Sequence, residues 1–154
     1  MKISRNPPVA AVRGLLAEAG LPTEDLGDAL PHFLACGPAD HPTGVVGIEL
    51  YGFDALLRSL VVAPVARRDG RGRALVEAAE SHARSLGVRR LYLLTQSAER
   101  FFLRCGYEVV ERAQAPEGIR ASREFSALCP ASARFMGKTL ASAAEENGSS
   151  LEEV

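Results

Sequence analysis

The middle of the chain shows the alternation of apolar and polar positions that is typical of half-buried β-strands. Within Val45–Tyr51, the apolar residues at positions 46, 48 and 50 point to one side, while Glu49 and Tyr51 point to the other. A more uniformly apolar stretch, Leu56–Val62, follows the turn residues Gly52–Ala55. Two such runs joined by a short turn predict an antiparallel hairpin.

Apolar residues recur at helical spacing in other parts of the chain. Pro8–Gly20 predicts a helix that begins at a proline and ends at a glycine, and Ala74–Leu86 predicts a helix that ends before Gly87. Further helices are expected at Thr23–Leu30, Ser97–Arg104 and Pro130–Leu140, and further strands at Phe33–Cys36, Arg90–Thr95, Tyr107–Arg112 and within Glu117–Leu128.

The order of these elements predicts the fold class. Helices come first, then the hairpin, then strand, helix, strand, helix and strand, which gives an α/β domain with a mixed central sheet flanked by helices and antiparallel N-terminal strands. A length of 154 residues favours a single domain, which we place at residues 1–140. Residues 141–154 hold four glutamates, no basic residue and few large apolar residues, so we expect an acidic, disordered tail.

Composition and charge exclude several classes of function. The net charge of −1 gives no general attraction to nucleic acid or to an anionic membrane, and no apolar run approaches the roughly 18 residues of a membrane span. The start of the chain lacks the apolar core of a signal peptide. The three cysteines, Cys36, Cys105 and Cys129, are odd in number and show no metal-ligand spacing. We therefore expect a cytoplasmic protein with reduced thiols and no bound metal, nucleic acid or membrane; a homodimer stays open.

A basic, glycine-containing loop between the hairpin and the next helix carries the strongest chemical signal. It reads Arg67-x-x-Gly70-x-Gly72 and leads directly into the helix at Ala74. Glycines allow a ligand to approach the backbone amides closely, and a helix N-terminus adds unpaired donors and a partial positive charge. Leu75 replaces the third glycine of a dinucleotide fingerprint, which excludes that reading. The loop therefore predicts a pyrophosphate site, the alternative being a solvated basic turn.

Several motifs together resemble the GCN5-related N-acetyltransferase (GNAT) superfamily, whose members use acetyl-CoA. The basic loop follows Leu60-Val61-Val62-Ala63-Pro64, and Ala98-x-x-Phe101-Phe102-x-x-Cys105-Gly106-Tyr107 is similar to a second family motif. More narrowly, Leu57–Leu60, Leu93–Thr95 and Glu124–Ala133 resemble the branch found with arsenic-resistance genes.

The resemblance implies how acetyl-CoA would be bound. Strand backbone would align the pantetheine arm, main-chain amides of the basic loop would hold the pyrophosphate, and a V-shaped splay between the strands of Val62 and Leu91 would admit the thioester. The implied cofactor-binding residues are Leu60, Val61, Val62, Arg67, Arg68, Asp69, Gly70, Arg71, Gly72, Arg73, Ala74, Ser97 and Phe101.

Acetyl transfer to an amine needs a group that removes a proton, and Glu49 is the best candidate. Glu49 lies among apolar residues, and a turn at Phe53–Asp54 would place it opposite Arg58. The alternative is that Glu49 and Arg58 form a structural ion pair. Phe102 occupies a position where the family often has a proton-donating tyrosine, so Tyr51 or water would have to supply that proton.

Other chemistry-bearing residues favour structural roles. His82 shares a helix face with apolar residues and is expected to be packed or half-buried, and Tyr107 is expected to belong to the core.

The leading hypothesis is an N-acetyltransferase acting on a primary amine of a small molecule, with a toxic or arsenic-containing amino acid suggested by the branch resemblance. The alternatives are acetylation of a protein amine and a non-catalytic acetyl-CoA-binding module.

Overall fold

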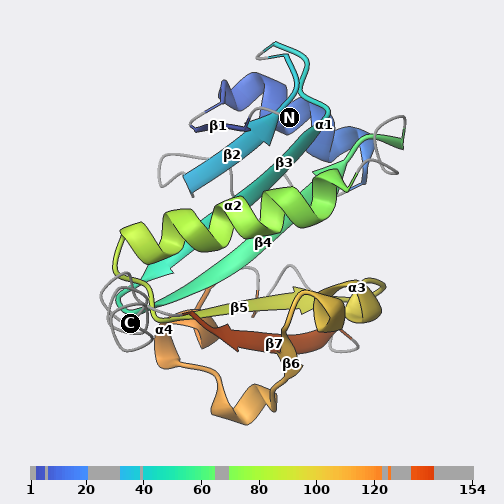
Figure 1. Ribbon diagram of the computed structural model, residues 1–154. Helices are drawn as coiled ribbons and strands as arrows, with labels where there is room; N and C mark the ends of the chain where they lie inside the picture. The colour runs from blue at the N-terminus through green and yellow to red at the C-terminus, as the bar shows by residue number, and fades with distance from the viewer. Residues whose placement is uncertain are drawn as a thin grey trace, which may run out of the picture.

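A seven-stranded mixed sheet forms the centre of the computed structural model, which describes residues 3–5, 7–20, 32–38, 40–64, 70–122, 125 and 133–140 (Figure 1). The first four strands in the sheet are antiparallel neighbours, the fourth and fifth are parallel, and the last two pairings are antiparallel. In spatial order the strands are β1 (Ile3–Arg5), β2 (His32–Cys36), β3 (Gly44–Tyr51), β4 (Asp54–Val62), β5 (Arg90–Thr95), β7 (Arg134–Thr139) and β6 (Glu108–Val109). The predicted fold class is confirmed.

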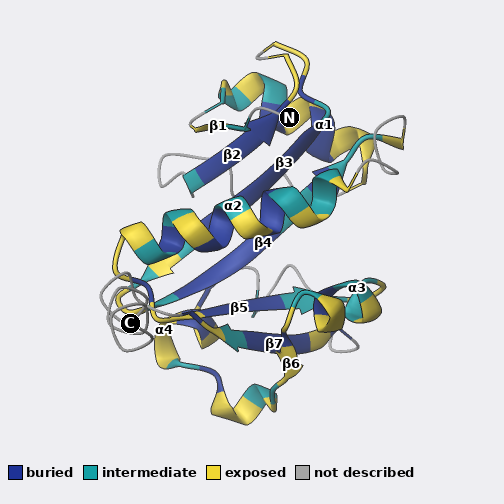
Figure 2. Ribbon diagram, in the orientation of Figure 1, coloured by how far each residue is buried: buried dark blue, intermediate teal, exposed yellow. Residues whose placement is uncertain are grey.

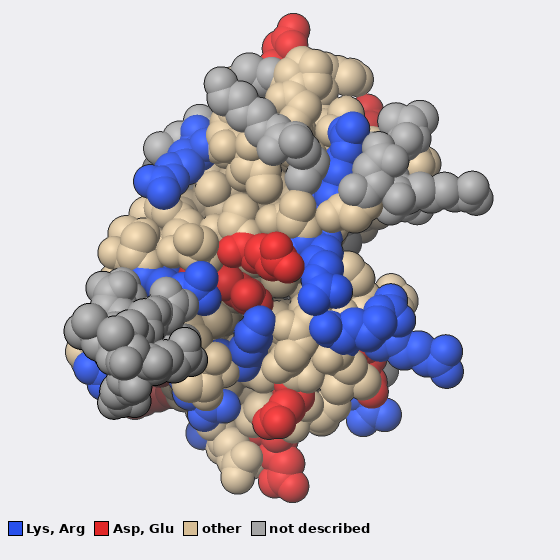
Figure 3. Space-filling model, viewed as in Figure 1, with Lys and Arg blue, Asp and Glu red and all other residues tan. Residues whose placement is uncertain are grey.

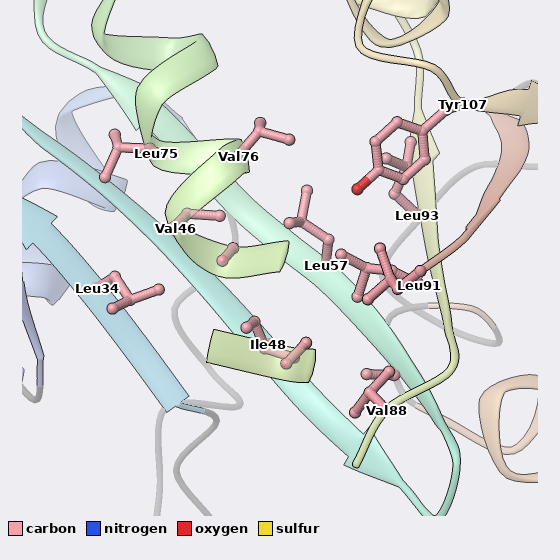
Figure 4. Close-up of a cluster of buried hydrophobic side chains, with 14 of the residues drawn as sticks. Leu34, Val46, Ile48, Leu57, Leu75, Val76, Val88, Leu91, Leu93 and Tyr107 are labelled. Atoms are coloured by element: carbon pink, nitrogen blue, oxygen red, sulfur yellow. The ribbon is translucent and has the colours of Figure 1, made fainter. Parts of the chain in front are cut away.

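Helices cover both faces of the sheet. On one face, α2 (Arg71–Ser85) packs its apolar side onto the strands, and Figure 4 shows Leu75 and Val76 in one cluster with Val46 and Leu57. On the other face, α1 (Val9–Glu18) contributes Leu16 to a separate cluster with Phe33 and Ala35 of β2, Val45 of β3 and Val61 of β4. The central strands are accordingly buried along most of their length (Figure 2). The shorter helices are α3 (Glu99–Arg104) and α4 (Glu117–Arg120).

The parallel pair β4 and β5 is joined over only three residue pairs. Asp54 to Leu56 pair with Arg90 to Tyr92, and both strands then continue without pairing to each other. The two ribbons in Figure 1 accordingly meet on the left and separate toward the right. This divergence confirms the predicted splay, and we call it the β4–β5 opening.

The hairpin is present, but its predicted register is wrong. The turn consists of Gly52 and Phe53, because Tyr51 pairs with Asp54. Gly52 has φ 68°, a left-handed conformation that tight hairpin turns need and that a phenylalanine rarely adopts. The shift places Leu56, rather than Arg58, directly opposite Glu49.

The C-terminal third differs most from the sequence prediction. The expected helix at Pro130–Leu140 is wrong, because Arg134–Thr139 forms β7 between β5 and β6. In the range Glu117–Leu128, which was expected to contain a strand, residues Glu117–Arg120 form α4 after Pro116, with an acidic residue in the first turn, and residues 123, 124 and 126–128 lie outside the described residues. A short apolar run inside a fully covered sheet has no alternation that separates strand from helix.

Smaller differences concern β1, which was not predicted, and Tyr107–Arg112, whose strand is limited to Glu108–Val109 and is followed by a 3₁₀ turn at Arg112–Gln114. The expected helix at Thr23–Leu30 and the acidic tail lie outside the described residues. In the described part of the chain, no helix has the length and apolar character needed to cross a membrane.

Candidate active site

The N-terminus of α2 presents backbone amides beside the β4–β5 opening. Gly70 precedes the helix with φ 69°, and its carbonyl accepts the first helical hydrogen bond from the Ala74 amide at 3.1 Å. The amides of Arg71, Gly72 and Arg73 therefore precede the i→i−4 ladder, where a helix has donors to offer an anion. The Ala74 amide is engaged within the helix, so we do not count it as a phosphate donor. Arg67, Arg68 and Asp69 lie outside the described residues.

Gly72 faces the space between β4 and α3. A Cβ built on Gly72 would lie 3.5 Å from the Phe101 ring and 3.8 Å from a Val62 methyl group. The fold thus brings together Val62, Gly72 and Phe101, which were predicted from three separate motifs. In Figure 3 the right-hand edge of the molecule is indented between the N-terminal end of α2 and α3. Ser97 lies exposed in the turn between β5 and α3.

The described arginine side chains near this helix end have protein partners. Arg71 donates from Nη1 to Thr43 Oγ1 at 2.8 Å, and Arg73 donates from Nε to Glu77 Oε1 at 3.3 Å on the exposed side of α2. Backbone amides, rather than these two guanidinium groups, are therefore the donors that point to an anion site here.

Beyond Leu56, the edge of β4 faces the opening. Among the described residues, no strand pairs with β4 on this side between Leu57 and Val62. Leu60 and Val62 are half-buried on the α2 face, and Val61 is buried on the α1 face. An extended chain such as a pantetheine arm can add to a strand edge of this kind through main-chain hydrogen bonds.

A β-bulge in β4 lies at the start of the opening. Val45 pairs with Val61 and Gly47 pairs with Arg58, so Val46 alone opposes Ser59 and Leu60. Ser59 has φ 56°, which is uncommon for a residue other than glycine. The extra residue changes which side chains face α1, so that Arg58 before the bulge and Val61 after it lie on the same face.

On that face, Glu49 is held by two hydrogen bonds. Its Oε2 accepts from Arg58 Nη1 at 2.7 Å, and its Oε1 accepts from the Tyr51 hydroxyl at 2.7 Å. The Arg58 side chain is 1% exposed and the Glu49 side chain 18% exposed. The predicted contact between Glu49 and Arg58 is therefore present, although it runs diagonally across the hairpin.

An aromatic cluster surrounds Tyr51 and continues along the same face. Gly118 of α4 packs against Tyr51, since a Cβ at Gly118 would lie 3.1 Å from the ring. Tyr92 stacks on Phe135 with ring centroids 5.3 Å apart, and Phe125 meets Phe135 edge-on at 5.4 Å. Sequence reasoning missed this cluster, because Phe135 lies in a segment that was predicted to be a helix, although Tyr51 and Tyr92 lie in predicted strands.

The structure excludes two aromatic residues as proton donors. Phe102 is buried edge-on between Phe101 and Tyr107 and has no hydroxyl group. The Tyr107 hydroxyl donates to Glu80 Oε2 at 2.9 Å, and burial together with the Glu80 carboxylate raises the pKa of Tyr107 far above its usual range. Tyr107 is a core residue, as predicted.

The remaining predicted residues lie away from the opening or have structural surroundings. His82 is half-buried, with its ring centroid 5.5 Å from that of His32. Cys36 is buried and Cys105 half-buried, both as free thiols, while Cys129 lies outside the described residues.

Solved structures with the same fold include several CoA complexes. An N-acetylglutamate synthase from Neisseria gonorrhoeae, complexed with coenzyme A and N-acetyl-glutamate, is 19% identical with a TM-score of 0.73; the match covers 92% of this chain and 36% of that one. A Mycobacterium tuberculosis protein in complex with CoA is 19% identical with a TM-score of 0.75, over 92% of this chain and 100% of that chain.

An aminoglycoside 6'-N-acetyltransferase complexed with coenzyme A is 18% identical with a TM-score of 0.67, over 90% of this chain and 97% of that one. No curated protein matches the sequence. The model of the acetyltransferase (GNAT) family matches residues 12–107, which include the hairpin, the N-terminus of α2 and the motif that ends at Tyr107. A match over more than half of the residues establishes membership: the chain belongs to the GNAT family of acetyltransferases, enzymes that use acetyl-CoA as cosubstrate.

Proposed function

We propose that this acetyltransferase transfers the acetyl group to a primary amine of a small molecule at the β4–β5 opening. The main support is the position of two groups around the opening. The N-terminus of α2 lies beside it on one face of the sheet, and the partly exposed Glu49 carboxylate lies on the other face, where the pairing of β4 with β5 ends. An anion site and a proton acceptor on the two sides of one gap are what a reaction between a CoA thioester and an amine requires.

In this proposal the cofactor runs along β4 toward the gap. The amides of Arg71, Gly72 and Arg73 hold the pyrophosphate, and the edge of β4 at Leu60–Val62, which faces the opening, aligns the pantetheine arm. Gly72 supports this arrangement, because its lack of a side chain leaves the helix backbone accessible next to Val62 and Phe101. Arg67, Arg68, Asp69 and Ser97 complete the cofactor site.

Glu49 acts on the amine. The uncharged nitrogen attacks the thioester carbonyl carbon, the nitrogen proton passes to Glu49 directly or through one water, and the C–S bond breaks to release CoA thiolate, which takes up a proton. Arg58 and Tyr51 fix the Glu49 carboxylate through their two hydrogen bonds. Tyr51 lies under α4 toward the hairpin turn, which favours orienting Glu49 over protonating the thiolate.

The acceptor is a small amine that reaches Glu49 next to the half-buried side chain of Tyr51. The finer proposal, that the amine belongs to a toxic or arsenic-containing amino acid, rests on the resemblance of three sequence segments to the arsenic-resistance branch. Two structural neighbours bear names of enzymes that acetylate amines, glutamate in one and aminoglycosides in the other.

A thiol-release assay tests the proposal. Purified protein is mixed with acetyl-CoA and with a panel of amino acids, arsenic-containing amino acids, aminoglycosides and short peptides, and the acetylated product is identified by mass. We expect release with at least one small primary amine and none with its N-acetylated form. Release only with peptides would replace the small acceptor by a protein amine. CoA binding without release for any amine would indicate a non-catalytic module.

A further inference from the structure

Thr43, in the turn between β2 and β3, contacts three separate segments through three different groups. Its amide donates to the Cys36 carbonyl at 2.9 Å, and its carbonyl accepts from the Ala63 amide at 2.7 Å. Its hydroxyl oxygen accepts from Arg71 Nη1 at 2.8 Å. One half-buried residue therefore links the end of β2, the residue after β4 and the first residue of α2.

These contacts lie at the two ends of the segment that carries the phosphate-loop motif. Ala63 precedes that segment, and Arg71 lies within its motif as the first residue of α2, so the carbonyl and the hydroxyl of Thr43 contact the chain before the loop and at its helical end. The hydroxyl bond has a charged donor and a partly buried setting, which makes it stronger than a bond between neutral groups. The ends of a loop fixed in this way lose less freedom when a ligand binds between them.

The packing around Thr43 leaves little room for the helix end to move. A Cβ on the next residue, Gly44, would lie 2.9 Å from both the Leu75 Cδ1 atom and the Cys36 Sγ atom. The backbone of β3 thus lies directly against the second turn of α2. Packing already holds the N-terminal end of α2 close to β3. The Arg71–Thr43 hydrogen bond therefore sets the orientation of this helix end rather than its distance from β3.

We propose that the Thr43 hydroxyl is a positioning group for acetyl-CoA, acting through Arg71 to orient the amides of the first turn of α2 toward the pyrophosphate. Thr43 does not touch the cofactor in this account. The inference rests on the proposed phosphate site at Arg71–Arg73, and it adds a residue outside the family's loop motif that sets affinity for the cofactor.

The test compares Thr43→Val, which keeps the shape and removes the hydroxyl, with Thr43→Ser, which keeps the hydroxyl. We expect Thr43→Val to raise the Kd for CoA and the KM for acetyl-CoA about tenfold, the effect of losing roughly 1.4 kcal/mol. The kcat at saturating acetyl-CoA and the KM for the amine should stay within about twofold, and Thr43→Ser should behave like the wild type.

Acetyl-pantetheine, which lacks the pyrophosphate, separates positioning from general damage. Its KM should be the same for the wild type and Thr43→Val; an equal loss with both donors would contradict the inference, as would unchanged CoA binding. If Thr43→Val does not fold, Thr43→Ala supplies the same comparison. Gly72→Val tests the phosphate site itself, and normal CoA binding by that variant would contradict the proposed site. If Gly72→Val binds CoA weakly and Thr43→Val binds it normally, only the role proposed for Thr43 is contradicted.

Discussion

Replacing Glu49 by Gln separates its catalytic role from its structural one. The substitution keeps the size of the side chain and removes the negative charge that Arg58, which is 1% exposed, contacts at 2.7 Å. Removing one partner of a fully buried pair costs about 3–5 kcal/mol, and the partial exposure of Glu49 lowers our expectation to about 2–3 kcal/mol. For a chain of this size, the melting temperature should fall by about 4–12 °C.

The turnover number should fall much further than stability can explain. Loss of a general base lowers the rate by about 10²–10⁴-fold, while the Kd for CoA should change by less than about threefold. The assay is thiol release at saturating acetyl-CoA and amine over pH 6–9, with the folded fraction determined by a separate melt.

Two matched variants make the interpretation specific. Arg58→Met breaks the same ion pair from the other side and should lose similar stability, but it retains the Glu49 carboxylate and should keep far more activity than Glu49→Gln. Tyr51→Phe removes one hydrogen bond and should cost about 1 kcal/mol. Full turnover by folded Glu49→Gln at every pH would refute the base assignment, and equal losses in Glu49→Gln and Arg58→Met would make the ion pair structural.

Further predictions concern the cofactor and the histidine pair. CoA at 100 times its Kd should stabilise the fold by about 2.7 kcal/mol, visible as a rise of about 5–10 °C in the melting temperature, and no shift at saturation would contradict cofactor binding. Gly72→Val should weaken CoA at least about tenfold by calorimetry, while the apo melting temperature stays within about 3 °C, since the position has room for a Cβ. The pKa of His82 is lowered by burial, with Arg5 and His32 adding to the effect. The unfolded chain therefore binds this proton more readily, so stability should decline as the pH falls below about 6.5, and His82→Gln should show a flatter decline in urea titrations between pH 7 and 5.

The sequence predicted the structure best where the spacing of apolar residues and the glycines at the ends of a segment indicate the same element. The hairpin, α2 and β5 follow from apolar spacing and from glycines at their ends, and the convergence of Val62, Gly72 and Phe101 follows from the family resemblance. In each of these segments the local sequence and the tertiary packing favour the same secondary structure.

The register of the hairpin could not be decided from the sequence, because two-residue turns at Gly52–Phe53 and at Phe53–Asp54 both fit the apolar pattern. The contact between Glu49 and Arg58 was predicted from a direct pairing but arises from a diagonal one, since an arginine is long enough to span either geometry. The bulge at Ser59 had no sequence signal, because bulges with a left-handed residue usually carry glycine there.

The C-terminal third was hardest to predict because β7 is an inner strand of the sheet and side chains on both of its faces are buried. Met136 packs in the cluster under α2 and Phe135 in the aromatic cluster on the opposite sheet face, and Gly137 is also buried, so the run does not alternate. Such a strand is recognised only once its neighbours are known. The aromatic cluster beside Glu49 depends on Phe135 and was invisible for the same reason.

A crystal structure of the protein with CoA would show where the cofactor binds and which way its thiol points. We predict pyrophosphate oxygens at about 2.7–3.2 Å from the amides of the first turn of α2, the pantetheine arm along Leu60–Val62, and the thiol in the β4–β5 opening on the side that leads to Glu49. CoA bound elsewhere on the surface, or with its thiol directed away from Glu49, would contradict the account.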